Sequence, residues 1–341
     1  IKVIEFASVL AGPAVGMFFA ELGAEVIKVE NKRTGGDVTR GWKTPGEDPN
    51  CPISAYWASV NFRKTYRMLD LEDLNDRQQA IELALGADVV ISNFSPAAAV
   101  GFGLDAGALM SQNPRLIYAQ LQAYPDASDT RPAFDVVLQA ETGFMSMTGE
   151  AGRPAVRMPV AFIDLLAAHQ LKEGILLALW QREQTGKGAL VRTSLFESAV
   201  ASLANQATNW LMAGHLPAPM GSQHPNIAPY GDQLLCASGA PIVLAVGTER
   251  HFERLCNALG EPEKYLDLRF HTNSLRVQHR TELLEWLNSR FQEQDVDHWM
   301  ALLHQHGVPA APIRNLQQLF EHPDVPVSYT HLRAHETVLD L

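Results

Sequence analysis

The sequence predicts an α/β protein with a Rossmann-like large domain and a smaller α+β domain. Short apolar strands alternate with helical segments through about residue 120, which is typical of a mostly parallel sheet covered on both faces. Near residue 214 the composition shifts toward Pro, Gly, His and Asn without periodicity. Beyond that shift lie one more strand and three amphipathic helices.

The elements follow in order along the chain. We expect strands at 3–6, 25–29, 87–91, 115–120 and 189–193 in the large domain, and at 242–246 in the small one. We expect helices at 15–22, 73–85, 106–110, from about 164, and at 195–212, 251–259, 280–291 and 296–306. The predicted domains are therefore 1–213 (large), 214–230 (linker or active-site loop) and 231–325 (small).

Residues 326–341 fit neither domain and resemble translated vector or adaptor sequence, so we expect them to be non-native. His331 and His335 in this tail have a spacing that ligands on one helical face would have, but that spacing is too common to indicate a metal. The chain also begins without Met and directly in an apolar strand, which suggests a fragment lacking its true start.

Composition excludes several classes of function. The formal net charge of −11 disfavours general binding to nucleic acid or to a membrane surface. The three cysteines are far apart, so neither a disulfide framework nor a CxxC metal site is expected, and a reduced cytoplasmic compartment is the simplest prediction. The most apolar stretch, 160–180, carries Asp164, His169, Lys172 and Glu173, which favours a core helix over a membrane span.

Two segments are candidate anion sites. The turn Ala11-Gly12-Pro13 offers free amides at a helix start, although an ordinary βα turn explains its position better. A basic cluster of Lys28, Lys32, Arg33 and Arg40 follows the second strand, where α/β sheets bind nucleotides; a solvated loop is an equal alternative. The absence of GxGxxG and GxxxxGK[ST] motifs disfavours a dinucleotide oxidoreductase and excludes a P-loop.

Asp164 is the most informative acidic residue, since it lies between Ile163 and Leu165 where an apolar helix begins. It is either an N-cap or a desolvated carboxylate able to attack an activated carbonyl. Asp135, in another apolar stretch, is a second acid of the same kind. The residues alone leave both interpretations open.

A series of ordered motifs adds a resemblance to a known family. They are Leu10-Ala11-Gly12-Pro13, Leu22-Gly23-Ala24-Glu25-Val26-Ile27-Lys28-Val29-Glu30, Gly36-Asp37-Val38-Thr39-Arg40, Asn93-Phe94-Ser95-Pro96, Asn113-Pro114-Arg115-Leu116-Ile117-Tyr118-Ala119, Thr185-Gly186-Lys187-Gly188 and Gly307-Val308-Pro309-Ala310-Ala311-Pro312. From Ile1 to about Val325 the chain resembles the class III CoA-transferases. This family includes formyl-CoA, carnitine and bile-acid CoA-transferases, L-carnitine dehydratase-like proteins and α-methylacyl-CoA racemase.

The resemblance implies an acyl-CoA donor, a carboxylic-acid acceptor, coenzyme A as the carried group and no metal. It assigns Asp164 as the nucleophile that forms an acyl anhydride and then an aspartyl-CoA thioester, with Asp135 orienting these intermediates. It implies binding of CoA by Val9, Leu10, Ala11, Lys32, Arg33, Arg40 and Asn93. It also implies a substrate loop containing Gly221, Gln223 and His224, and an interlocked homodimer.

Several residues depart from the family pattern. Leu10 replaces the Gln of formyl-CoA enzymes and their glycine-rich lid is absent, which argues against formyl-CoA and oxalate as substrates. Gly101 replaces a basic residue that contacts CoA, which favours a non-catalytic CoA-binding protein as one alternative. Phe134 stands where the racemase branch has a His, so racemisation, which needs two bases, is the weaker enzymatic alternative. Some tens of family residues are missing at the C-terminus, so we expect this chain to be poorly stable or inactive.

Overall fold

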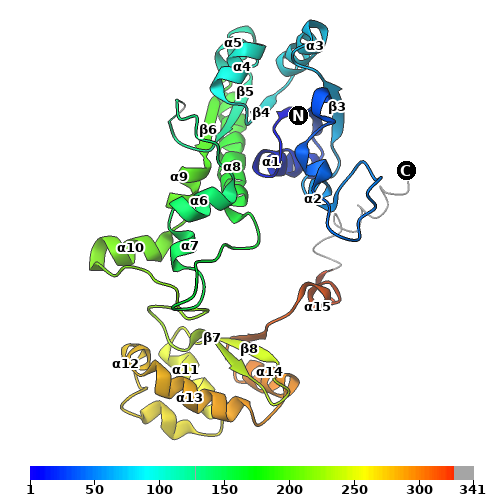
Figure 1. The fold of residues 1–341 in the computed structure, drawn as a ribbon. Coiled ribbons are helices and arrows are strands. Elements are labelled where there is room, and N and C mark those ends of the chain that lie inside the picture. Colours follow the sequence, from blue (N-terminus) through cyan, green and yellow to red (C-terminus); the bar gives the residue numbers. More distant parts are fainter. Residues whose placement is uncertain (127, 326–341) are drawn as a thin grey trace. The chain divides into compact units, whose positions relative to one another are not determined.

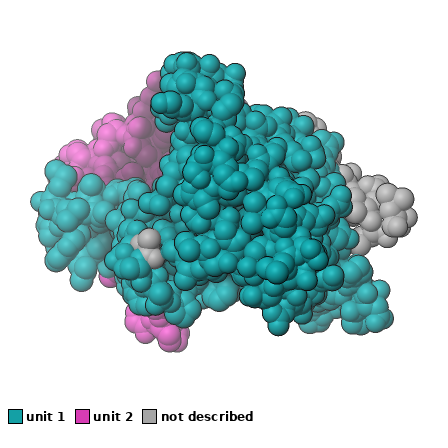
Figure 2. Space-filling model, turned by 90° about the horizontal axis from the view of Figure 1, so that it is seen from above, with its two compact units in different colours: residues 1–146, 156–217, 330–341 teal, residues 147–155, 218–329 magenta. Residues whose placement is uncertain are grey.

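The computed structural model describes residues 1–126 and 128–325. The described residues form two compact units, coloured separately in Figure 2. Of the described residues, unit 1 contains Ile1–Ser146 and Val156–Pro217, and unit 2 contains Met147–Ala155 and 218–325. The division therefore falls four residues after the predicted end of the large domain, and unit 2 includes 147–155, which the sequence did not indicate. The predicted tail with His331 and His335 lies outside the described residues.

Unit 1 is built on a six-stranded parallel sheet (Figure 1). Its strands are β1 (Lys2–Phe6), β2 (Glu25–Asn31), β3 (Thr65–Leu69), β4 (Val89–Ser92), β5 (Ile117–Gln122) and β6 (Leu190–Ser194). Their order, β3-β2-β1-β4-β5-β6, is that of the doubly wound Rossmann fold, with the switch point between β1 and β4. The Rossmann-like prediction is confirmed, although β3 was not predicted.

Alternating side chains of these strands supply two apolar layers. Val3, Val26 and Val89 point into a core shared with α1 and α8, while their neighbours Ile4, Ile27 and Val90 point into a second core under α3 and α5. The helices of unit 1 are α1 (Ala11–Glu21), α2 (Ala55–Ala58), α3 (Leu74–Leu85), α4 (Pro96–Phe102), α5 (Ala106–Gln112), α6 (Asp135–Glu141), α7 (Phe144–Met147), α8 (Phe162–Thr185), α9 (Leu195–Ala201) and α10 (Ala204–Ala213). Short 3-10 turns occur at Lys32–Thr34 and Val38–Gly41.

Two predicted helices differ from the observed ones. The helix expected at 15–22 already begins at Ala11, so Ala11-Gly12-Pro13 is the first helical turn and not a separate turn. Gly12 is required there because a Cβ would overlap the side chain of Ala7. The helix expected at 195–212 is divided into α9 and α10, and the break lies beside Ala204, whose φ is +47°.

Unit 2 is an α+β unit, as predicted. Its antiparallel sheet has the order β7 (Tyr230–Leu235), β8 (Pro241–Ala245), β9 (Ala310–Pro312). Its helices are α11 (Glu249–Ala258), α12 (Asn273–Gln278), α13 (Arg280–Phe291), α14 (Val296–Gln305) and α15 (Leu316–Phe320), with a 3-10 turn at Pro262–Leu266. Ile242 and Leu244 of β8 pack against Phe252 and Leu287 in its core. Among the described residues of both units, no helix is long and apolar enough to cross a membrane.

Candidate active site

Asp164 is the third residue of α8, and its side chain does not cap the helix. The N-cap position is Ala161, and the N-terminus has no side-chain cap. The N-cap interpretation of Asp164 is therefore wrong. Ile163, Ala167 and Leu171 form the buried face of α8 at helical spacing, and Asp164 follows directly at the edge of this face. The carboxyl group lines a cavity of about 330 Å³ together with Val9, Leu10 and Ala11.

The surroundings of Asp164 favour its neutral form. Burial raises the pKa of Asp164, and the nearby charge of Asp135 raises it further, to about 7. Within the part of the chain that the structure describes, no hydrogen-bond donor contributes to this pKa. Burial, followed by the charges of Asp164, Asp135 and Asp37, also raises the pKa of Tyr56, so its hydroxyl group stays protonated at neutral pH. No pattern in the sequence indicated Tyr56.

Both carboxylate oxygens of Asp135 accept a hydrogen bond. Its carboxylate accepts a hydrogen bond from the backbone N–H of Ile163 at 2.8 Å and another from the side-chain amide of Gln139. The oxygen of the Gln139 amide accepts the backbone N–H of Met158 at 2.8 Å. The side chain of Asp135 therefore ties the start of α6 to the first turn of α8, immediately before Asp164.

The loop between β1 and α1 forms the wall of the cavity that contains Asp164. Val9 lies in this loop with a φ of +74°, and its N–H donates to the carboxylate of Asp37 at 3.1 Å. Leu10 is the N-cap of α1, and Ala11 is its first residue. The structure thus brings together the predicted nucleophile and three of the predicted CoA-binding residues, although about 150 positions separate them in the sequence.

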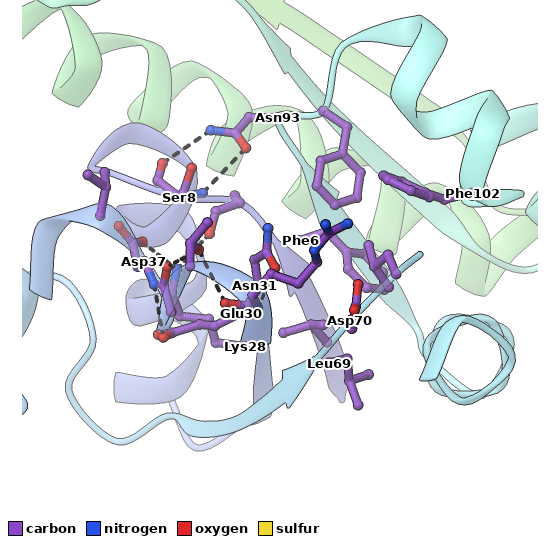
Figure 3. A pocket seen from close by; sticks show the side chains of 18 of the residues that line it. Phe6, Ser8, Lys28, Glu30, Asn31, Asp37, Leu69, Asp70, Asn93 and Phe102 are labelled. Carbon is purple, nitrogen blue, oxygen red and sulfur yellow. Dashed lines mark hydrogen bonds and ion pairs between the residues drawn. The ribbon is translucent and has the colours of Figure 1, made fainter. Parts of the chain in front are cut away.

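A larger cavity of about 830 Å³ lies where β1, β2 and β4 end (Figure 3). This is the crevice at the switch point, where open α/β sheets bind ligands. At this crevice the side chain of Asn93 connects the segments after β4 and β1. It accepts a hydrogen bond from the N–H of Ser8 at 3.3 Å and donates one to the Ser8 carbonyl oxygen at 3.1 Å. Ser8, Asn93, Phe94 and Ser95 line both cavities, so the two share a wall.

The predicted basic cluster separates into paired and available cations. Lys28 is buried and forms ion pairs with Glu5 at 2.9 Å and Asp37 at 3.1 Å. Arg40 pairs with Glu30 at 2.7 Å, so its charge is compensated too. Lys32 and Arg33 are exposed, and Arg33 lines the larger cavity. Of the predicted phosphate contacts, Arg33 has the most suitable position.

Glu5, Asp37 and Lys64 form a buried charge network with Lys28 that was not predicted from the sequence. A signal for part of it exists in the sequence. Glu5 and Lys28 each interrupt an apolar strand, and a charge in such a strand must find a partner of opposite charge. Lys64 lies 59 positions from Glu5 and carries no comparable signal.

The predicted substrate loop belongs to unit 2. Gly221 has a φ of +63°, Gln223 forms a hydrogen bond with Asp232, and the His224 carbonyl oxygen accepts a hydrogen bond from Arg280. Burial and the charge of Arg280 lower the pKa of His224. Asp164 belongs to unit 1, so a role of this loop at the Asp164 cavity stays a prediction.

Comparison with known proteins identifies the family. The profile of CoA-transferase family III matches residues 1–336. The chain belongs to CoA-transferase family III.

Relatives in this family are named for transfer between carboxylic acids. The succinate–glutarate CoA-transferase of Agrobacterium fabrum is 34% identical over 330 residues, which cover 95% of this chain and 82% of the relative. The human succinyl-CoA:glutarate CoA-transferase is 33% identical over 327 residues, 95% of this chain and 73% of the relative. A solved CAIB/BAIF family protein from Brucella suis is 37% identical with a TM-score of 0.81, covering 96% of this chain and 86% of that one.

Proposed function

We propose that this chain is an acyl-CoA:carboxylate CoA-transferase in which Asp164 is the nucleophile. The observation that carries the proposal is a buried carboxyl group in a cavity that adjoins the switch-point crevice, with a pKa raised by burial and by Asp135 to about 7. Such a carboxylate is poorly solvated when ionised, which increases its reactivity toward a thioester carbonyl.

The two adjoining cavities suit the two ends of an acyl-CoA. We place the nucleotide in the larger cavity, where the exposed Arg33 supplies a positive charge. The pantetheine chain then passes Asn93 and Ser8, which line both cavities, and the thioester lies beside Val9, Leu10 and Ala11. Lys32 and Arg40 have supporting roles at most in this arrangement, since Lys32 does not line the cavity and Arg40 is paired with Glu30.

In the proposed reaction every intermediate is an activated acyl species, either an anhydride or a thioester. The Asp164 carboxylate attacks the acyl-CoA carbonyl, which gives a mixed anhydride and releases the CoA thiolate. The thiolate attacks the aspartyl carbonyl, which gives the aspartyl-CoA thioester and releases the donor acid. The acceptor carboxylate attacks this thioester to form a second anhydride, and the thiolate then attacks its acyl carbonyl, which releases the new acyl-CoA and free Asp164. In this scheme Asp135 holds the first turn of α8 and orients Asp164.

Names of relatives point to dicarboxylic acids as substrates. Relatives are named for succinate and glutarate, for oxalate, and for mesaconate. We therefore propose a dicarboxylyl-CoA donor and a dicarboxylate acceptor. We further propose the family's interlocked homodimer and a cytoplasmic location, in which the three free cysteines stay reduced.

The test is a transfer assay on Asp164→Asn and Asp164→Ala, with succinyl-CoA as donor and glutarate, oxalate or mesaconate as acceptor. Loss of the nucleophile should lower kcat by about three orders of magnitude or more. Asp105→Asn is the matched control, because Asp105 caps α5 through the Ala108 N–H and lines neither cavity. Full activity of either Asp164 variant would refute the mechanism. Deuterium uptake at the α-carbon without an acceptor would indicate a racemase, and CoA binding without turnover would indicate a binding protein.

A further inference from the structure

The loop between β1 and α1 contains a strained residue beside Asp164. Val9 has a φ of +74°, in the left-handed region that β-branched residues rarely adopt. Val9 also lines the cavity of Asp164. A strained backbone conformation persists only where surrounding contacts hold it, and such conformations cluster at functional sites.

The contact that holds Val9 is the carboxylate of Asp37. The N–H of Val9 donates to Oδ2 of Asp37 at 3.1 Å and lies 3.4 Å from Oδ1. Asp37 is itself fixed, because Oδ1 accepts the Thr39 N–H at 3.0 Å and the Thr39 hydroxyl at 2.8 Å. Lys28 Nζ lies 3.1 Å from Oδ2, and the side chain of Asp37 is 1% exposed.

The same buried charge network holds the chain on both sides of Val9, in the loop and in the first turn of α1. Lys28 donates to the carbonyl oxygen of Ala7 at 2.6 Å, and Lys64 donates to the carbonyl oxygen of Pro13 at 2.8 Å. Glu5 joins the two lysines, at 2.9 Å from Lys28 and 2.7 Å from Lys64. Two acids and two lysines thus balance in charge, and their hydrogen bonds reach the chain before Val9, at Val9 and in the first turn of α1.

We propose that Asp37 is a positioning residue, which holds the strained Val9 loop in the wall of the Asp164 cavity through its hydrogen bond to the Val9 amide. The proposal rests on the proposed role of Asp164 as nucleophile. Without this bond Val9 relaxes to a negative φ, and the wall beside Asp164 changes shape. Asp37 lines the larger cavity but not the cavity of Asp164, so its effect on the reacting group passes through Val9.

Asp37→Asn and Val9→Gly separate this role from a general structural one. Asn keeps the size of Asp, but its amide NH₂ must face at least one of the donors that now surround the carboxylate. Glycine adopts a φ of +74° without strain, so a loop that carries Val9→Gly needs the bond to residue 37 less. The experiment compares kcat and KM of the wild type, the two single variants and the double variant. The effect of Val9→Gly alone is measured as well, so that the effect of Asp37→Asn can be compared in the two backgrounds.

We expect Asp37→Asn to lower kcat by about 100-fold, the order of loss that a misplacement near 1 Å causes, while KM for the acyl-CoA changes less. In the Val9→Gly background the same change should lower kcat by only about 10-fold or less, because the two positions are coupled. Equal losses in both backgrounds would overturn the proposal.

Asp88→Asn is the control for the loss of an ion pair away from both cavities; the side chain of Asp88 is partly exposed. Asp88 accepts the backbone N–H of Lys2 at 2.8 Å and pairs with Arg182 at 3.0 Å, but it directly precedes β4, at the end of the sheet where the parallel strands begin. The substitution Asp88→Asn should lower the melting temperature and leave kcat unchanged. If Asp37→Asn merely matches Asp88→Asn in kcat, positioning by Asp37 is refuted.

A second variant, Asp37→Glu, and a second measurement, hydrogen exchange, test the proposal even if Asp37→Asn misfolds or the protein is inactive. Asp37→Glu keeps the charge next to Lys28, and the same comparison in the two backgrounds applies to it. Hydrogen exchange of the segment 6–13 should rise in the Asp37 variants while the core strands stay protected, and unchanged exchange there would overturn the anchoring. A wild-type protein that transfers no CoA would refute the proposed function alone, since the exchange measurement still tests the loop.

Discussion

Two opposing effects act on the protonation of the Asp164 carboxyl group. Its place at the N-terminus of the 24-residue helix α8 favours the charged form. Burial and the charge of Asp135 favour the neutral form, and they prevail, because the pKa of Asp164 is raised to about 7. A pKa near neutral pH keeps a large share of the group ionised while the ionised form remains poorly solvated.

This pKa predicts the pH dependence of the reaction. The nucleophile is the ionised form, and the pKa of Asp164 is about 7. Therefore kcat/KM should decrease as the pH falls below about 7, and a plot of log kcat/KM against pH should approach a slope of one at low pH. Asp135→Asn removes the second cause of the shift and should move the midpoint to lower pH. A pH–rate series with both proteins checks this, and an unchanged midpoint in the variant would contradict it.

The same raised pKa predicts a cost in stability. A folded-state pKa above the unfolded value means that protonation favours folding. The contribution of Asp164 is thus fully favourable below about pH 4 and is lost as the pH rises toward 7. Asp164→Asn, which mimics the neutral form, should be more stable than wild type above pH 7, by up to about 4 kcal/mol, a gain that vanishes near pH 4. Urea unfolding at several pH values measures this; equal stability at pH 8 would contradict it.

At the scale of elements, close approaches between backbones require glycine. Gly188 precedes β6, and a Cβ at that position would overlap the carbonyl group of Leu116 just before β5. The obstacle is backbone, so it cannot move aside as the end of a side chain can. The conformation of the motif that contains Gly188 is therefore set by the pairing of β5 with β6.

We expect Gly188→Ala to lower the free energy of unfolding by at least about 2 kcal/mol, because the added methyl group strains the β5–β6 pairing. Gly101 in α4 is the matched control, since a Cβ there has no neighbour within 4 Å. Gly101→Ala should change stability by less than about 1 kcal/mol, in the stabilising direction. Thermal or urea unfolding decides between these outcomes, and equal effects of the two substitutions would contradict the steric explanation.

The strands with nearly continuous burial were predicted from the sequence, but β6 was predicted too, although only its last residue is buried. β1 and β4 are short apolar runs buried on both faces and were recognised. β3 lies at the edge of the sheet, and its first three residues, Thr65 to Arg67, are exposed, so it lacks that pattern. Local sequence patterns also predicted only part of the candidate active site. The apolar flanks of Asp164 indicated desolvation, but its proximity to Asp135 and to Val9 depends on tertiary contacts that no local pattern encodes.

At the scale of the whole molecule, unit 1 carries the Asp164 cavity, the larger cavity and an exposed apolar helix. In α10, Trp210, Leu211 and Met212 are 51%, 77% and 86% exposed. Adjacent apolar side chains with such exposure are typical of surfaces that another chain covers. This supports the proposed homodimer.

We therefore expect wild-type protein at micromolar concentration to have twice the mass of one chain in light scattering. Leu211→Asp should weaken the dimer, because it places a charge in the covered surface. Leu74→Asp is the matched control: Leu74 is 75% exposed but lies at the start of α3. A monomeric wild type, or equal dimer stability in the two variants, would contradict the interface.

The most direct test of the central claim is to trap the intermediate on Asp164. Wild-type protein is mixed with succinyl-CoA, treated with hydroxylamine or borohydride, digested and analysed by mass spectrometry. We expect modification of the peptide that contains Asp164, at that residue, and none in Asp164→Asn. Turnover of the donor with Asp164 unmodified, or the same modified peptide in Asp164→Asn, would contradict the role of Asp164 as nucleophile.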